Sequence, residues 1–310
     1  MAYNFFNPGY GDAFPSNHGD AGIAAPGESY YTNGDGVIWK SRGYGDEIHI
    51  EAPKLKEIWA KFTMWITQTR YDSNNNTNIF CINPANDAFI KLKMNGNGNQ
   101  IIGYMDDRRL GASDTLTVNT PYEVKIHAKL GKTDGIFEVF INDKAIVQYE
   151  GQTMESLGRY PVITEYRLAI TPYMGMYNIL VADTNIFDTK ITYCIVKDVS
   201  DTGNFTDAEQ TLSGAIDVNE LKERIKTQYG NPQISYIGFS IRRFSVDFNK
   251  VNAFKARLTL GESEKVGETH KMKPQNHTPT GCPAFLFEVP KLSVDRLKDV
   301  HMFVTSKKEP

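Results

Sequence analysis

Four side chains could meet a ligand on the surface of predicted β-strands: Trp59, Trp65, His127 and Phe140. In the run 58–67 (IWAKFTMWIT), the apolar residues at every second position form one face, and both tryptophans lie on the other face among polar residues. Two later strands place His127 and Phe140 opposite their apolar faces in the same way. Aromatic rings beside polar groups suit stacking on the C–H surface of a sugar. A second sheet packed on this face explains the pattern as well, and it is the simpler of the two interpretations.

Catalytic acids are not evident at useful spacings. Glycoside hydrolysis needs two carboxylates placed across the scissile bond. Glu47, Glu51 and Glu57 are spaced for neither a strand pair nor a helix pair, and Asp106 and Asp107 precede two arginines in a solvated loop. The GxSxG, P-loop and HExxH motifs are also missing. We therefore predict a protein that is not an enzyme. The alternative is a carbohydrate-active enzyme, a glycoside hydrolase or lyase, whose acids come from loops.

Metal sites are weakly indicated. Three side chains that zinc could use lie in one C-terminal loop: His270, His277 and Cys282. Their spacing fits no zinc pattern. The loop 72–78, or Asp183 and Asp188, could supply oxygen ligands to Ca²⁺, although the density of acids is lower than in a dedicated site. We predict no metal and no cofactor, with Ca²⁺ as the one alternative.

Composition limits the classes of partner. The 310-residue chain has a formal net charge of −3, so it lacks the basic excess typical of nucleic-acid binding. It has no apolar run near the roughly 20 residues that span a bilayer. The first ten residues contain neither a basic nor an apolar signal region, so no Sec-type signal peptide is predicted. The three cysteines are odd in number and far apart, so the fold does not depend on disulfides.

The spacing of strands predicts the fold. The stretch 122–151 alternates apolar and polar residues through three runs, and Asn142 and Asp143 form a tight turn between the second and third. Roughly ten short strands of this kind fall between residues 30 and 187. The chain is therefore predicted to be mainly β, with an antiparallel two-sheet jelly-roll sandwich at 30–187.

A smaller domain is predicted at 188–310. It is β-rich, of the α+β kind, with one helix near 218–229. Asp217 can cap this helix, Glu220 follows three residues later, and Gly230 with Pro232 ends it.

Residues 30–187 resemble a concanavalin A-like lectin/glucanase jelly roll of the laminin-G-like kind. The resemblance rests on the strand rhythm and on the hairpin GIFEVFINDKAIVQYEG at 135–151. It implies two stacked antiparallel sheets that bind any ligand on the concave face or at the rim loops. The glucanases of this class carry an ExDxxE strand, which is absent here.

The start of the chain and the appended small domain also resemble bacteriophage virion proteins such as tail, baseplate or head decorations. That resemblance implies a structural or adhesion protein of a virion or other extracellular assembly. Its jelly roll would bind a glycan or a neighbouring subunit.

Residues 1–29 are predicted to form an extended arm. Gly and Pro disfavour regular structure in this segment, yet it contains several aromatic side chains that need a host surface: Phe5, Phe6, Tyr10 and Phe14. The arm either packs on its own domain or inserts into a neighbouring subunit or a larger assembly. We predict the second, in a homo-oligomer for which the phage resemblance makes a trimer the simplest form.

Overall fold

The computed structural model describes the backbone of two compact units, residues 1–187 and 188–310, each of which is considered separately. The described residues are 4–7, 17–18, 21–23, 39–41, 46–66, 77–83, 89–95, 99–154, 161–170, 174–188, 191–196, 210–215, 217–231, 233–241, 244–245, 253–261, 263–266, 270–271, 280–281 and 284–307.

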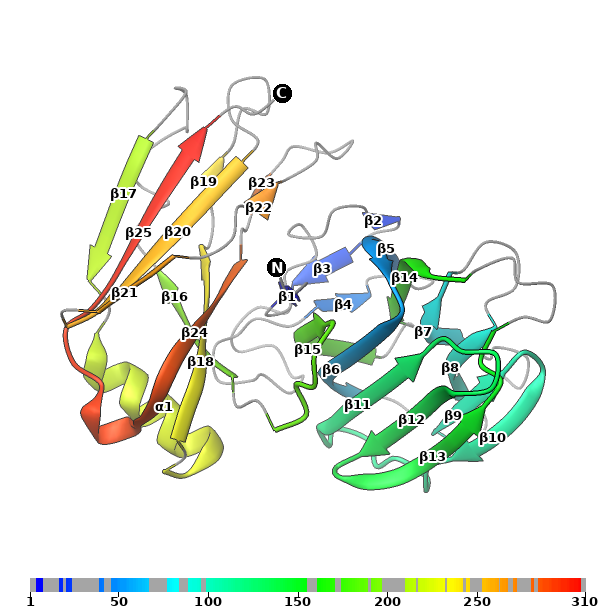
Figure 1. Cartoon of the computed structure of the whole chain (residues 1–310). Helices are drawn as coiled ribbons and strands as arrows, with labels where there is room; N and C mark the ends of the chain where they lie inside the picture. Colours follow the sequence, from blue (N-terminus) through cyan, green and yellow to red (C-terminus); the bar gives the residue numbers. More distant parts are fainter. Residues whose placement is uncertain are drawn as a thin grey trace. The chain divides into compact units, whose positions relative to one another are not determined.

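Unit 1 consists of two antiparallel sheets (Figure 1). Sheet A has the order β13 (Lys144–Gly151), β12 (Gly135–Ile141), β11 (Tyr122–Lys129), β6 (Glu57–Ile66), β15 (Met174–Ala182), β4 (Trp39–Ser41) and β3 (Ala21–Ile23), and β1 (Asn4–Asn7) also pairs with β15. Sheet B has the order β10 (Arg108–Ala112), β9 (Gln100–Met105), β8 (Ile90–Asn95), β7 (Thr77–Ile82), β14 (Ile163–Ile170), β5 (Asp46–Leu55) and β2 (Asn17–His18).

The core lies between the two sheets, as strand alternation requires. The apolar face of β6 is buried in it, and Phe62 is 1% exposed. Phe137 from sheet A and Phe80 and Tyr166 from sheet B are each 0% exposed. Burial of one face of each sheet confirms the predicted mainly β, two-sheet sandwich.

Two glycines let the sheets approach each other at one end. A Cβ added to Gly111 in β10 would overlap the carbonyl oxygen of Ile146 in β13, and one added to Gly103 would overlap Val147 Cγ2. Only glycine leaves room for this contact.

The predicted turn after β12 is also present, because Asn142 and Asp143 both adopt positive φ, at 47° and 65°.

The N-terminal arm contains more regular structure than its composition indicates. β1, β2 and β3 pair with β15, β5 and β4 of the same chain. The prediction that Gly and Pro prevent regular structure is wrong for these segments, since two to four residues suffice to extend a sheet edge. Phe5 and Phe6 lie in β1 opposite Val181 and Leu180, whereas Tyr10 and Phe14 lie outside the described residues.

The described residues of unit 2 combine an α-helix with short sheets. α1 (Val218–Tyr229) precedes β18 (Gln233–Ile241), which pairs in parallel with β16 (Ile191–Val196) and antiparallel with β24 (Ala284–Ser293). A second sheet has the order β17 (Gln210–Ala215), β25 (Val300–Lys307), β20 (Ala253–Leu260) and β21 (Ser263–Val266), and β22 (His270–Lys271) pairs with β20. The remaining elements are the β19 (Phe244–Ser245) and β23 (Thr280–Gly281) pair and the 3₁₀ helix Val294–Arg296.

The start of α1 follows the predicted capping chemistry. The backbone N–H of Asn219 donates to Asp217 Oδ1 at 2.9 Å, and Gly230 has a φ of 75° just beyond the last turn. Leu221 and Ile225 are buried on one side of the helix. Among the described residues, no helix is both long and apolar enough to cross a membrane.

Candidate functional site

The outer face of sheet A, opposite the core, collects side chains from three adjacent strands. His127 in β11 lies directly opposite Trp59 in β6 on one side and opposite Glu138 in β12 on the other. Residues directly opposite each other in adjacent strands project to the same side of a sheet. Trp59, His127 and Glu138 therefore form a row across the face that does not pack into the core.

The centre of this row is a buried imidazole held by two carboxylates. His127 is 7% exposed, and its Nε2 lies 2.8 Å from Glu57 Oε1 while its Nδ1 lies 2.9 Å from Glu138 Oε2. The Trp59 ring stacks on the imidazole with a centroid distance of 4.3 Å and an interplanar angle of 9°. We call these four residues the His127 cluster.

The hydrogen bonds of the His127 cluster depend on its proton count. A neutral imidazole has one N–H and can donate to one carboxylate, whereas an imidazolium donates to both. The side chains of Glu57 and Glu138 are 34% and 30% exposed, so a ligand in solvent could reach both carboxylates. The arrangement can thus hold a proton and pass it to a group bound at the surface.

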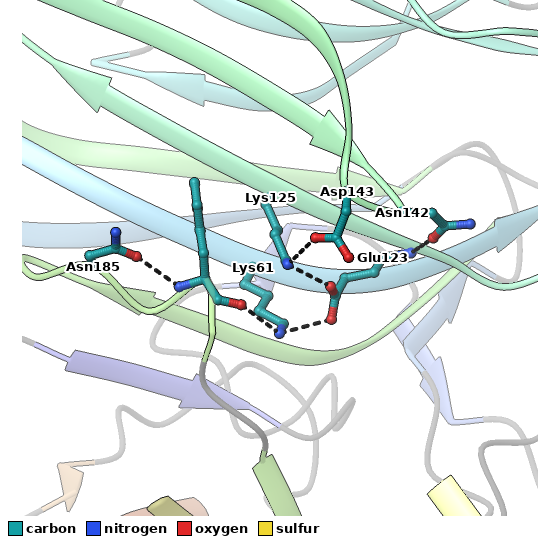
Figure 2. A network of polar contacts seen from close by, with 7 residues as sticks. Lys61, Glu123, Lys125, Asn142, Asp143 and Asn185 are labelled. Carbon is teal, nitrogen blue, oxygen red and sulfur yellow. Dashed lines mark hydrogen bonds and ion pairs between the residues drawn. The ribbon is translucent and has the colours of Figure 1, made fainter. Parts of the chain in front are cut away.

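A second ionic network occupies the next row of the same face (Figure 2). Glu123 bridges two lysines, with its Oε2 2.8 Å from Lys61 Nζ and its Oε1 3.1 Å from Lys125 Nζ. Lys125 also donates to Asp143. Lys61 and Lys125 are only 8% and 7% exposed. Burial pulls the pKa of Lys125 down, but the bond to Asp143 and the charge of Glu123 outweigh it, so the pKa lies above the ordinary value of 10.5.

The segment after β15 lies against this network. Lys61 Nζ donates to the carbonyl oxygen of Phe187 at 3.3 Å, and the Phe187 N–H donates to Asn185 Oδ1 at 3.0 Å. The Phe187 ring meets Phe140 edge-on, with centroids 5.6 Å apart. Phe140 therefore contacts the segment after β15 through Phe187.

The structure brings together two of the four predicted ligand-face residues. Trp59 and His127 are in direct contact, whereas Phe140 lies one row away, opposite Lys125. Trp65 lies in β6 opposite Gly175, and its side chain is outside the described set. The role of these residues in ligand binding stays a prediction.

Sequence reasoning missed both carboxylates of the cluster. The spacing of Glu57 indicates no catalytic pair, and the alternative enzyme is expected to carry its acids on loops. Both acids are in strands, since Glu57 begins β6 and Glu138 lies within β12. The position of Glu138 beside His127 could be predicted from the register of the β11–β12 hairpin. The position of Glu57 beside His127 depends on the pairing of β6 with β11, and these two residues are 70 positions apart in the sequence.

The predicted metal ligands do not form a cluster in the described part of the chain. No group of three or more His, Cys, Asp or Glu side chains there is arranged to hold an ion. His277, Cys282 and residues 72–76 lie outside the described ranges.

No family model and no curated protein matches this chain. Similar solved structures include the sialidase of Trypanosoma rangeli, with 10% identity and a TM-score of 0.38, covering 48% of this chain and 25% of that chain. The alginate lyase Aly36B has 13% identity and a TM-score of 0.34, covering 55% of this chain and 97% of that chain. The chain therefore spans about a quarter of the sialidase.

One prediction does not stand against these comparisons. The predicted absence of enzymatic activity is contradicted, because both similar structures are named as enzymes that act on carbohydrates. The enzymatic likeness is weak, at 10% and 13% identity. The predicted roles in a phage particle, in a homo-oligomer and in glycan adhesion stay predictions.

Proposed function

We propose that unit 1 is a carbohydrate-active domain that cleaves a glycan on the outer face of sheet A, at the His127 cluster. One observation carries the proposal. Two carboxylates from different strands bind the two nitrogens of one buried imidazole on the face opposite the core. A purely structural strand face has no need to bury a titratable ring between two acids.

The other features of the site fit a sugar ligand. Trp59 is half-buried against His127 and offers an indole to the C–H face of a pyranose. The partly exposed carboxylates of Glu57 and Glu138 can accept hydrogen bonds from hydroxyl groups. The cluster would thus both orient a sugar ring and exchange a proton with it.

The chemistry would be general acid–base catalysis. In a hydrolase, one carboxyl group protonates the leaving oxygen while a second carboxylate assists water or attacks the sugar. In a lyase, a base removes the proton next to the uronate carboxyl group, and the leaving oxygen takes a proton from an acid. In both reactions His127 would connect the two carboxylates and set which of them carries the proton.

The test is incubation of the full chain with a panel of neutral and uronate-containing polysaccharides. New reducing ends with no ultraviolet absorbance identify hydrolysis, whereas an absorbing unsaturated product identifies elimination. We expect Glu138→Gln or Glu57→Gln to lower kcat by about 10²–10⁴-fold, the usual contribution of an acid–base group. Glu150→Gln is the matched control, because Glu150 is exposed on β13 outside the cluster.

The variants separate catalysis from binding. Trp59→Ala should raise KM more than it lowers kcat, since the indole would hold the sugar without transferring a proton. No product from any polysaccharide would contradict the proposal. So would activity that persists in Glu57→Gln, Glu138→Gln and the double variant while each remains folded.

A further inference from the structure

The outer face of sheet B carries a row of cations in register. Arg109 in β10 lies opposite Tyr104 in β9, which lies opposite Lys91 in β8. The same row continues through Cys81 in β7 to Arg167 in β14. Residues next to them in the same strands, such as Leu92 and Phe80, point to the opposite side of the sheet and belong to the core. The row is therefore on the outer face.

Lys93 joins this row from the next outward position of β8. Its Nζ lies 5.0 Å from the centroid of the Tyr104 ring. We define the sheet B stripe as Lys91, Lys93, Tyr104, Arg109 and Arg167.

Described carboxylates compensate Lys91, Lys93 and Arg109 of the stripe only in part. Lys91 is 5% exposed, and its partner Asp107 is 3.8 Å away with a side chain 96% exposed. Lys93 and Arg109 have no ion pair with a carboxylate of the described residues. On sheet A, by contrast, Glu123 lies within 3.1 Å of two lysines. A buried cation with so distant and hydrated a partner favours an additional anion.

The spacing of the charges indicates the form of that anion. Neighbouring strands lie about 4.7–4.9 Å apart, so cations on β10, β8 and β14, at every second strand, repeat at about 10 Å. A polyuronate in an extended two-residue repeat presents the carboxylates of alternate sugars on one side. Charges at every second strand can therefore meet charges at every second sugar ring, and Tyr104 between them can stack on a pyranose face.

We propose that the sheet B stripe binds an extended polyuronate. This inference is independent of the proposed function of sheet A, because it rests on different residues of a different sheet. Single-stranded nucleic acid also combines regular charge with ring faces. The stripe contains one aromatic ring, Tyr104, whereas binders of single strands stack successive bases on several aromatic side chains, so the uronate is the favoured ligand.

The test measures the affinity of the full chain for polygalacturonate, its fully methyl-esterified form, dextran sulfate and poly-dT, at low and high salt. The variant is Lys93→Gln with Arg109→Gln, because both side chains are at least partly exposed and can be changed without opening the core. The matched control is Lys132→Gln, an exposed lysine in the turn between β11 and β12. Thermal unfolding confirms that each variant is folded.

We expect polygalacturonate to bind in a salt-sensitive manner and its methyl ester not to bind. The double variant should weaken binding by about tenfold or more, the value of one to two charge-assisted hydrogen bonds, and the control should leave it unchanged. Equal losses in the control and the double variant would overturn the proposal. It would also be overturned by absent binding, or by dextran sulfate or poly-dT binding more tightly through the same two residues.

Discussion

Glu123→Gln tests the ionic network on the outer face of sheet A. The substitution keeps the shape of the side chain but removes the negative charge that two buried lysines share, at 2.8 Å from Lys61 and 3.1 Å from Lys125. Removing one partner of a buried ion pair costs roughly 3–5 kcal/mol. The Glu123 side chain is 31% exposed, and water screens part of the loss. We therefore expect the free energy of unfolding of unit 1 to fall by about 2–3 kcal/mol.

Asp143→Asn is the matched control within the same network. The Asp143 side chain is 79% exposed. When the charge of Asp143 is removed, Lys125 keeps its ion pair with Glu123. An exposed pair of this kind contributes about 0–1 kcal/mol. Lys61→Met in the Glu123→Gln background should restore part of the loss, because it removes one of the two buried charges that no longer have the Glu123 carboxylate beside them.

Urea unfolding followed by tryptophan fluorescence is the suitable assay. All three tryptophans of the chain lie between residues 1 and 187, so their signal reports unit 1 alone. With an m value of about 2–3 kcal/mol/M, the expected loss lowers the urea midpoint by about 1 M. The reasoning is refuted if Glu123→Gln changes stability by less than Asp143→Asn does.

Three further perturbations have expected outcomes. The raised pKa of Lys125 means that its ion pairs stabilise unit 1 fully below pH 10.5 and are lost as the pH rises through the higher folded value; alkaline urea titrations should show this fall, and show less of it in Asp143→Asn. Asp217→Ala removes the helix cap and should cost unit 2 about 0.5–2 kcal/mol, measured by circular dichroism. Gly111→Ala would place a methyl group against the Ile146 carbonyl and should destabilise unit 1 by about 1–3 kcal/mol; an unchanged urea midpoint would contradict the close approach.

The sandwich could be predicted because its signals are local. Alternation in 58–67 and 122–141 shows which side chains face a core, and Asn142–Asp143 marks a turn that needs positive φ. Helix α1 was predictable for the same reason, since its cap and its glycine stop lie within a few residues of its ends. Pattern and turn chemistry fix such elements without any knowledge of distant contacts.

The candidate site could be predicted only in part, because it depends on register between distant strands. Alternation places Trp59 and His127 on outward faces, but it cannot show that these two residues, 68 positions apart in the sequence, lie opposite each other (127 − 59 = 68). Glu57 joins them through the same pairing. The N-terminal arm was misjudged for a related reason. Its pairing with β15 needs only Asn4–Asn7, a length too short to produce a periodic signal.

The two outer faces of the sandwich differ in how their charges are compensated, and this difference separates their roles. On sheet A, His127 and Lys125 each contact two carboxylates within about 3 Å, so these polar groups are held by one another and can orient a ligand without strong dependence on salt. On sheet B, Lys93 and Arg109 have no ion pair with a carboxylate among the described residues, although Lys93 lies over the Tyr104 ring. Salt should therefore weaken binding at sheet B far more than cleavage at sheet A. A polyuronate held by sheet B would raise the local concentration of sugar for a site elsewhere on the same chain, provided that its free segments reach that site.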